Sequence, residues 1–106
     1  MIYIKEHRSD KGIILALCDS DLIGRVLKDN DASLDLKAYA SFYKGELKDV
    51  SYVKDFINSN RYKIITINAV GREAVDLLIA LSMIEDTNVR YVENVPYAFT
   101  VNLSLI

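Results

Sequence analysis

Residues 64–75, with the sequence IITINAVGREAV, most constrain what this chain can fold into. The run begins as a β-branched strand, breaks at Asn68 and Gly71, and continues with apolar residues at helical spacing. A strand at 63–67, a helix at 71–84 and a strand at 89–92 predict a βαβ unit. We expect its two strands to run parallel and its crossover to be right-handed.

The first 18 residues predict an antiparallel hairpin. Residues 2–7 alternate between polar and apolar side chains, and residues 13–18 form a continuous apolar run. The polar turn between them ends in Gly12, which can supply a positive φ. Both arms of the hairpin are therefore expected in the same sheet.

The remaining segments complete a mixed α+β or α/β fold. A second main helix is expected at 49–59, capped by Asp49 or Ser51, with a short helix at 22–27. Further strands are expected at 33–38 and 97–103. The prediction is a single domain, residues 1–106, with a mixed sheet of about five strands, an N-terminal hairpin, a C-terminal βαβ unit and two covering helices.

Composition excludes several functional classes. The net charge is −2, from 13 basic and 15 acidic residues, which argues against a strongly electrostatic DNA or membrane binder. One cysteine and one histidine exclude a disulfide framework or a disulfide-linked partner, and we expect no metal site and no cofactor. Without a signal peptide or an apolar run of about 20 residues, the chain is expected to be cytoplasmic.

The turn from Asn68 to Gly71 is the first candidate site. A helix that begins after a buried strand presents free N–H groups and positive potential to an anion. In this interpretation Asn68 donates from its amide, Gly71 lets a ligand approach the backbone, and Arg72 pairs with a phosphate or carboxylate. The alternative is structural: Asn68 caps the helix and Gly71 relieves strain at its start.

An aromatic and basic loop, FYKGE at residues 42–46, is the second candidate site. Aromatic side chains beside a lysine stack on exposed bases and contact phosphate in many modules that hold single-stranded RNA. Tyr43 and Lys44 are therefore candidate RNA-binding residues. The alternative is that these aromatic residues fill the edge of the core.

The chain carries no recognisable catalytic set. Cys18 ends a buried strand and is expected to be a packed, unreactive thiol. His7, the single histidine, lies on a different strand, so no nucleophile and base are paired by sequence. We therefore favour a binding function over an enzymatic one.

Three blocks carry a family resemblance: FYKGEL at 42–47, NAVGREAV at 68–75 and VPYA at 95–98. In this order they resemble an archaeal family of unknown function (domain of unknown function four-two-four) over essentially the whole chain. The resemblance implies a short cytoplasmic protein loosely associated with translation and RNA binding. Family members often have His where this chain has Tyr97, which argues against a histidine-dependent activity here.

Carried over residue by residue, the resemblance favours Asn68, Gly71 and Tyr43 as site candidates, followed by Lys44 and Arg72. Three functions remain open. The first and favoured one is a binding module for RNA or a ribonucleoprotein. The second is a small-ligand or anion-binding protein, or an enzyme, that uses the Asn68–Gly71 turn. The third is a protein-interaction module that pairs through an edge strand of the sheet.

Overall fold

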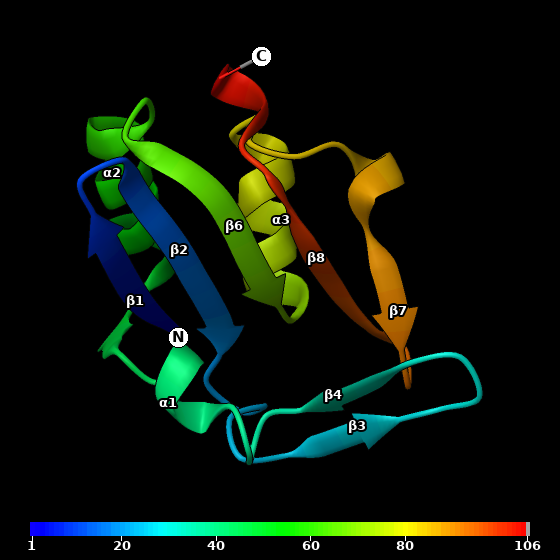
Figure 1. The fold of residues 1–106 in the computed structure, drawn as a ribbon. Coiled ribbons are helices and arrows are strands. Elements are labelled where there is room, and N and C mark those ends of the chain that lie inside the picture. Colours follow the sequence, from blue (N-terminus) through cyan, green and yellow to red (C-terminus); the bar gives the residue numbers. More distant parts are fainter. Residues whose placement is uncertain (106) are drawn as a thin grey trace.

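The computed structural model describes residues 1–105 as one six-stranded mixed sheet with two helices across one face (Figure 1). The strand order is β5-β1-β2-β6-β8-β7, and β3 pairs with β4 in a separate two-stranded sheet. The strands are β1 (Ile2–Ser9), β2 (Gly12–Asp19), β3 (Val26–Lys28), β4 (Ser33–Asp35), β5 (Glu46–Lys48), β6 (Ile64–Val70), β7 (Arg90–Val92) and β8 (Val95–Val101). The α-helices are α1 (Ala40–Tyr43), α2 (Val50–Asn60) and α3 (Arg72–Ala80), and short 3₁₀ turns lie at Asp86–Asn88 and Leu103–Leu105.

The predicted N-terminal hairpin is confirmed. Strands β1 and β2 are antiparallel, with Ile2 opposite Asp19 and Ser9 opposite Gly12. The second main helix is also confirmed, because Asp49 caps α2 by accepting a hydrogen bond from the backbone N–H of Tyr52 at 2.8 Å. Local sequence signals thus locate both elements correctly.

Strands β6 and β7 run in the same direction and are joined through α3, but they are not neighbours. Strand β8 lies between them and is antiparallel to both. The turn between β7 and β8 is made by Glu93 and Asn94, whose φ values are +48° and +63°. This tight turn pairs β8 with β7. Strand β8 also pairs with β6, so the adjacent parallel pair in the sheet is β2 with β6.

Helix α3 ends at Ala80 rather than at the expected residue 84. The φ of Ser82 is +58°, and its N–H donates to the carbonyl of Ile79 at 3.0 Å. The N–H of Met83 then donates to the carbonyl of Leu78 at 2.9 Å. These two bonds form a Schellman motif, which ends the helix although the apolar pattern continues.

The short helix expected at 22–27 is absent, and turns followed by β3 take its place. Gly24 has a φ of +84°, and its N–H donates to the carbonyl of Leu36 at 3.0 Å. The N–H of Leu36 donates in turn to the carbonyl of Arg25 at 2.8 Å. Long-range backbone pairing to Leu36 therefore replaces the local helical bonds.

The two faces of the sheet are covered differently. Helices α2 and α3 cover one face and bury the larger core. On the opposite face, Cys18 and Val70 pack under Leu27, Leu36 and Tyr43, which the β3–β4 hairpin, the segment after it and α1 supply. Figure 1 shows this hairpin crossing only one end of the sheet.

The rest of that face is open to solvent. Ile14 of β2 is 40% exposed, and Phe99 and Val101 of β8 are each 48% exposed. We call this surface the open sheet face. Within residues 1–105, no helix is long and apolar enough to cross a membrane.

Candidate functional site

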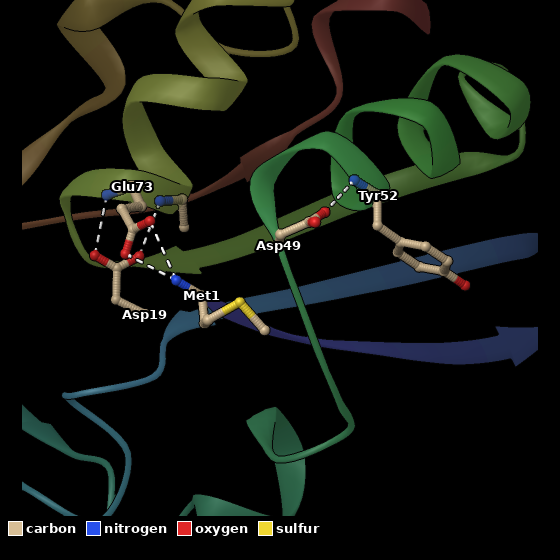
Figure 2. Close-up of polar contacts among 6 residues, drawn as sticks. Met1, Asp19, Asp49, Tyr52 and Glu73 are labelled. Carbon is tan, nitrogen blue, oxygen red and sulfur yellow. Dashed lines mark hydrogen bonds and ion pairs between the residues drawn. The ribbon is translucent and has the colours of Figure 1, made fainter.

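The N-terminus of α3 is occupied by a side chain from the end of β2 (Figure 2). The carboxylate of Asp19 accepts hydrogen bonds from the backbone N–H of Glu73 at 3.0 Å and of Ala74 at 2.9 Å. The amino group of Met1 lies 3.3 Å from the carboxylate of Glu73, which adds a second link between the strands and this helix end. The N–H groups that an anion would use therefore already bind the protein's own carboxylate.

Gly71 makes room for this carboxylate. It is buried with a φ of +109°, and a Cβ added there would lie 2.2 Å from Cγ of Asp19. Asn68 does not cap the helix, because β6 continues to Val70 and Asn68 pairs with Ala16 on one side and Phe99 on the other. At this turn the carboxylate of Asp19 packs directly against Gly71, and Asn68 belongs to the sheet.

Burial raises the pKa of Asp19, and the nearby carboxylates of Glu73 and Asp21 raise it further, while the hydrogen bonds from Glu73 and Ala74 oppose this shift. Burial also raises the pKa of the neighbouring Cys18 thiol to about 12, with smaller contributions from Asp19 and Asp21. A thiol of this kind is almost fully protonated at neutral pH. Cys18 is therefore packed, as the sequence predicted, and it is a poor nucleophile.

The structure separates the other candidate residues. Tyr43 is only 5% exposed, so its ring belongs to the core and presents no free face to a base. Burial raises the pKa of its hydroxyl. Lys44 is exposed at the end of α1, and Arg72 is exposed at the first turn of α3.

A cavity of about 380 Å³ lies between α1, β4, β6 and β8. Residues 33–36 form one side, and the aromatic rings of Tyr39, Phe42 and Phe99 form much of the rest. Asn68 and Tyr43 line the same cavity. It therefore brings together two of the residues that the sequence had singled out.

Two polar groups in this cavity have no hydrogen-bond partner in the described part of the chain. Within residues 1–105, neither the amide of Asn68 nor the hydroxyl of Tyr43 makes a hydrogen bond, and no fully shielded side-chain N or O atom is left without a partner. The unpaired atoms of Asn68 and Tyr43 must therefore reach solvent. Apolar walls with a few unpaired polar groups are typical of ligand sites.

A second hollow of about 430 Å³ adjoins this cavity. The two share Ser33, Leu34 and Phe99, and the second extends to Arg90 of β7. Phe99 also lies next to Tyr97, with ring centroids 5.2 Å apart and an interplanar angle of 48°. An aromatic surface on β8 thus borders both hollows.

Sequence reasoning missed Phe99, Tyr39 and Arg90. A signal for Phe99 was present, because Tyr97, Phe99 and Val101 alternate with period two and must share one face of their strand. The pattern does not show which face of the sheet remains exposed to solvent. That depends on how far the β3–β4 hairpin extends over the sheet.

The single histidine helps to hold α1 against the sheet. The His7 ring stacks on Phe42 with centroids 4.4 Å apart, and its Nε2–H donates to the carbonyl of Phe42 at 2.9 Å. Among the described residues, no group of three or more acidic, histidine or cysteine side chains is arranged to hold a metal ion.

Comparisons with known proteins give the fold and the family. A crystal structure of an uncharacterized conserved protein from Methanopyrus kandleri is similar in fold, with a TM-score of 0.73 and 21% sequence identity over 96% of this chain and 91% of that one. No curated protein matches the sequence. The model of one protein family, described as a protein of unknown function, matches residues 7–103. The chain therefore belongs to this family, DUF424.

Proposed function

We propose that this protein binds single-stranded RNA on the open sheet face, with Phe99 as the principal stacking residue. One observation carries the proposal: Phe99 is 48% exposed in the interior of a sheet, beside a cavity with unpaired polar groups. Aromatic side chains on an open sheet are a common platform for unpaired bases. The proposed RNA site is therefore on β8, and not at the Tyr43–Lys44 loop that the sequence suggested.

The charge balance favours stacking as the main source of affinity. The 13 basic residues are outnumbered by 15 acidic ones, so the net charge of −2 opposes phosphate binding, whereas stacking does not depend on net charge. Arg90 is exposed and lines the hollow next to Phe99, so it is the cation best placed for a backbone phosphate. We therefore expect modest affinity with a weak dependence on salt.

The other two functions have less support. The sheet has its edges at β5 and β7, each three residues long, and the C-terminal strand β8 is internal. Short edges offer few hydrogen bonds to a partner strand. A small-ligand function has one observation in its favour, the cavity of about 380 Å³, but at that site rather than at the α3 N-terminus.

The proposal places the protein in the cytoplasm, with RNA or a ribonucleoprotein as its partner. A link with translation, which the family resemblance implies, belongs to the same proposal. An RNA partner in this setting presents single-stranded loops or ends, because bases inside a duplex cannot stack on Phe99.

Titration of a fluorescent single-stranded RNA of about 12 nucleotides, followed by anisotropy at low salt, tests the proposal. Phe99→Ala should lose about 1–3 kcal/mol of binding free energy, which is the usual contribution of one stacked base. Tyr52→Ala is the matched control, because Tyr52 is 45% exposed but lies on α2, away from the open sheet face.

Duplex RNA of the same sequence should not compete. The proposal is wrong if the wild-type protein does not bind single-stranded RNA at low salt. It is also wrong if Phe99→Ala and Tyr52→Ala bind as the wild type does. Circular dichroism of each variant shows whether the fold is retained before its binding is interpreted.

A further inference from the structure

We propose that the cavity between α1 and β4 binds one nucleobase that carries an exocyclic amino group, with Asp35 as the acceptor for that group. The choice of a nucleobase as ligand rests on the proposed RNA function. The recognition of an amino group rests on the cavity itself. Three properties of the cavity carry the inference.

The first property is its shape and lining. Tyr39, Phe42 and Phe99 contribute aromatic surface from α1, the segment before it and β8. Phe42 is held in place by two rings, because it stacks on His7 and meets Tyr43 edge to face at a centroid distance of 5.0 Å. A preorganised aromatic wall favours a flat ring over a flexible aliphatic ligand.

The second property is the set of polar groups without partners. Tyr43 is only 5% exposed, yet its hydroxyl makes no hydrogen bond within residues 1–105. The same holds for the Asn68 amide, which offers both a donor and an acceptor. A ligand with hydrogen-bonding groups along one edge would satisfy both residues.

The third property is the charge of the lining. Asp35 is the one carboxylate among the described lining residues, and no lysine, arginine or histidine is among them. Oδ1 of Asp35 accepts from the N–H groups of Lys37 at 3.1 Å and Ala38 at 2.8 Å, and Oδ2 has no partner within residues 1–105. The cavity therefore disfavours a phosphate or carboxylate and favours a neutral ring that donates an N–H.

Free nucleosides test this inference without RNA. Guanosine against inosine, and adenosine against purine riboside, are pairs that differ only by the amino group. Two-dimensional NMR titrations of the wild-type protein should show about tenfold tighter binding of the amino-bearing member. The shifted amides should include Leu36, Asn68 and Phe99.

Asp35→Asn is the decisive variant, because an amide oxygen can still accept from Lys37 and Ala38 while the free carboxylate oxygen is lost. The preference for the amino-bearing nucleoside should disappear in Asp35→Asn. It should persist in Asp49→Asn, which makes the same change at the cap of α2. Asn68→Ala provides a second variant and should weaken both members of each pair.

The outcomes separate this inference from the proposed function. Nucleoside binding with the amino preference, in a protein that does not bind single-stranded RNA, supports the pocket and removes the RNA function. RNA binding that needs Phe99, without any nucleoside preference or effect of Asp35→Asn, overturns the pocket and keeps the RNA function. Absence of nucleoside binding at millimolar concentration also overturns the pocket.

Discussion

The carboxylate of Asp19 fills the space in which a side chain at Gly71 would begin. A Cβ at Gly71 would lie 2.2 Å from Cγ and 2.5 Å from Oδ2 of Asp19. The same carboxylate receives the first N–H groups of α3. The end of β2, the end of β6 and the start of α3 are therefore held together by one residue pair that is distant in sequence.

Gly71→Ala should lower the free energy of unfolding by roughly 2–5 kcal/mol, because it adds backbone strain at a φ of +109° and a steric clash with Asp19. Asp19→Ala should lower it by about 1–3 kcal/mol by leaving two helix N–H groups without an acceptor. In the double variant the clash is absent, so its loss should be smaller than the sum of the two single losses. Urea denaturation of the four proteins measures this coupling.

Gly24→Ala is the matched control for this cycle. Gly24 has a φ of +84°, but a Cβ there would meet no atom within 4 Å. Gly24→Ala should lower the free energy of unfolding by about 1–2 kcal/mol, from backbone strain alone. This loss should add to the loss caused by Asp19→Ala. Strict additivity for Gly71→Ala as well would show that the contact with Asp19 does not control this position.

The stability of the protein should depend on pH through Asp19. Burial raises the pKa of Asp19 in the folded protein above its ordinary value. Between the unfolded and the folded pKa of Asp19, the native state therefore binds more protons than the unfolded state does. The contribution of Asp19 to stability should therefore fall as the pH rises from about 4 through the folded pKa, and then stay constant. The cost of Asp19→Asn, measured by urea denaturation, should be largest at low pH. A cost that grows with pH would contradict this sign.

How much of this fold was predictable depends on where the determining contacts lie. The β1–β2 hairpin and helix α2 follow from local signals, a polar turn ending in Gly12 and a cap at Asp49. The insertion of β8 between β6 and β7 was missed, because its turn uses Glu93 and Asn94 at positive φ without any glycine. Asn is common at positive φ, but Glu is not, so the pair Glu93–Asn94 is a weaker hairpin signal than Asn-Gly or Asp-Gly.

The candidate site was only partly predictable for a related reason. In the structural interpretation of the 68–71 turn, Asn68 was expected to cap a helix, because Asn and Gly are both common turn residues. Hydrogen bonding from both neighbouring strands keeps it in β6 instead. The true cap, Asp19, lies 54 residues before Glu73, and no local pattern links the two.

Asn102 is a second residue whose importance is long-range. It is fully buried, and its amide donates to the carbonyls of Arg61 at 2.8 Å and Ile64 at 2.9 Å. Its side-chain oxygen accepts from the N–H of Ser104 at 2.9 Å. Asn102→Ala should destabilise the protein by roughly 2–4 kcal/mol, because one buried carbonyl, one partly buried carbonyl and one N–H lose their partner.

Asn88→Ala is the control for Asn102→Ala. Asn88 is only half-buried, and its side-chain oxygen accepts a solvent-exposed hydrogen bond from the backbone N–H of Glu85 at 2.9 Å. Asn88→Ala should therefore lower the free energy of unfolding by only about 0.5–1 kcal/mol, the usual value for a solvent-exposed cap. Equal losses for the two variants, measured from denaturant midpoints, would show that Asn102 does not hold the start of β6.

The thiol of Cys18 should react slowly with a neutral thiol reagent in the native protein at pH 7. Its pKa of about 12 leaves almost no thiolate, and its side chain is fully buried. Labelling should accelerate strongly in urea, when the chain unfolds. Rapid labelling under native conditions would instead indicate a locally open structure around the end of β2.

The last prediction separates stacking from charge in RNA binding. Phe99→Ala should weaken binding without changing its salt dependence, because a stacked base releases no counterion. Arg90→Ala should flatten the salt dependence by about one phosphate contact, for any RNA sequence. Arg72→Ala and Lys44→Ala test the sites first expected at the start of α3 and the end of α1. If the RNA lies on the open sheet face, Arg72→Ala should bind as the wild type does. If the salt dependence of RNA binding changes in Arg72→Ala but not in Arg90→Ala, the RNA binds at the N-terminus of α3 and not on β8.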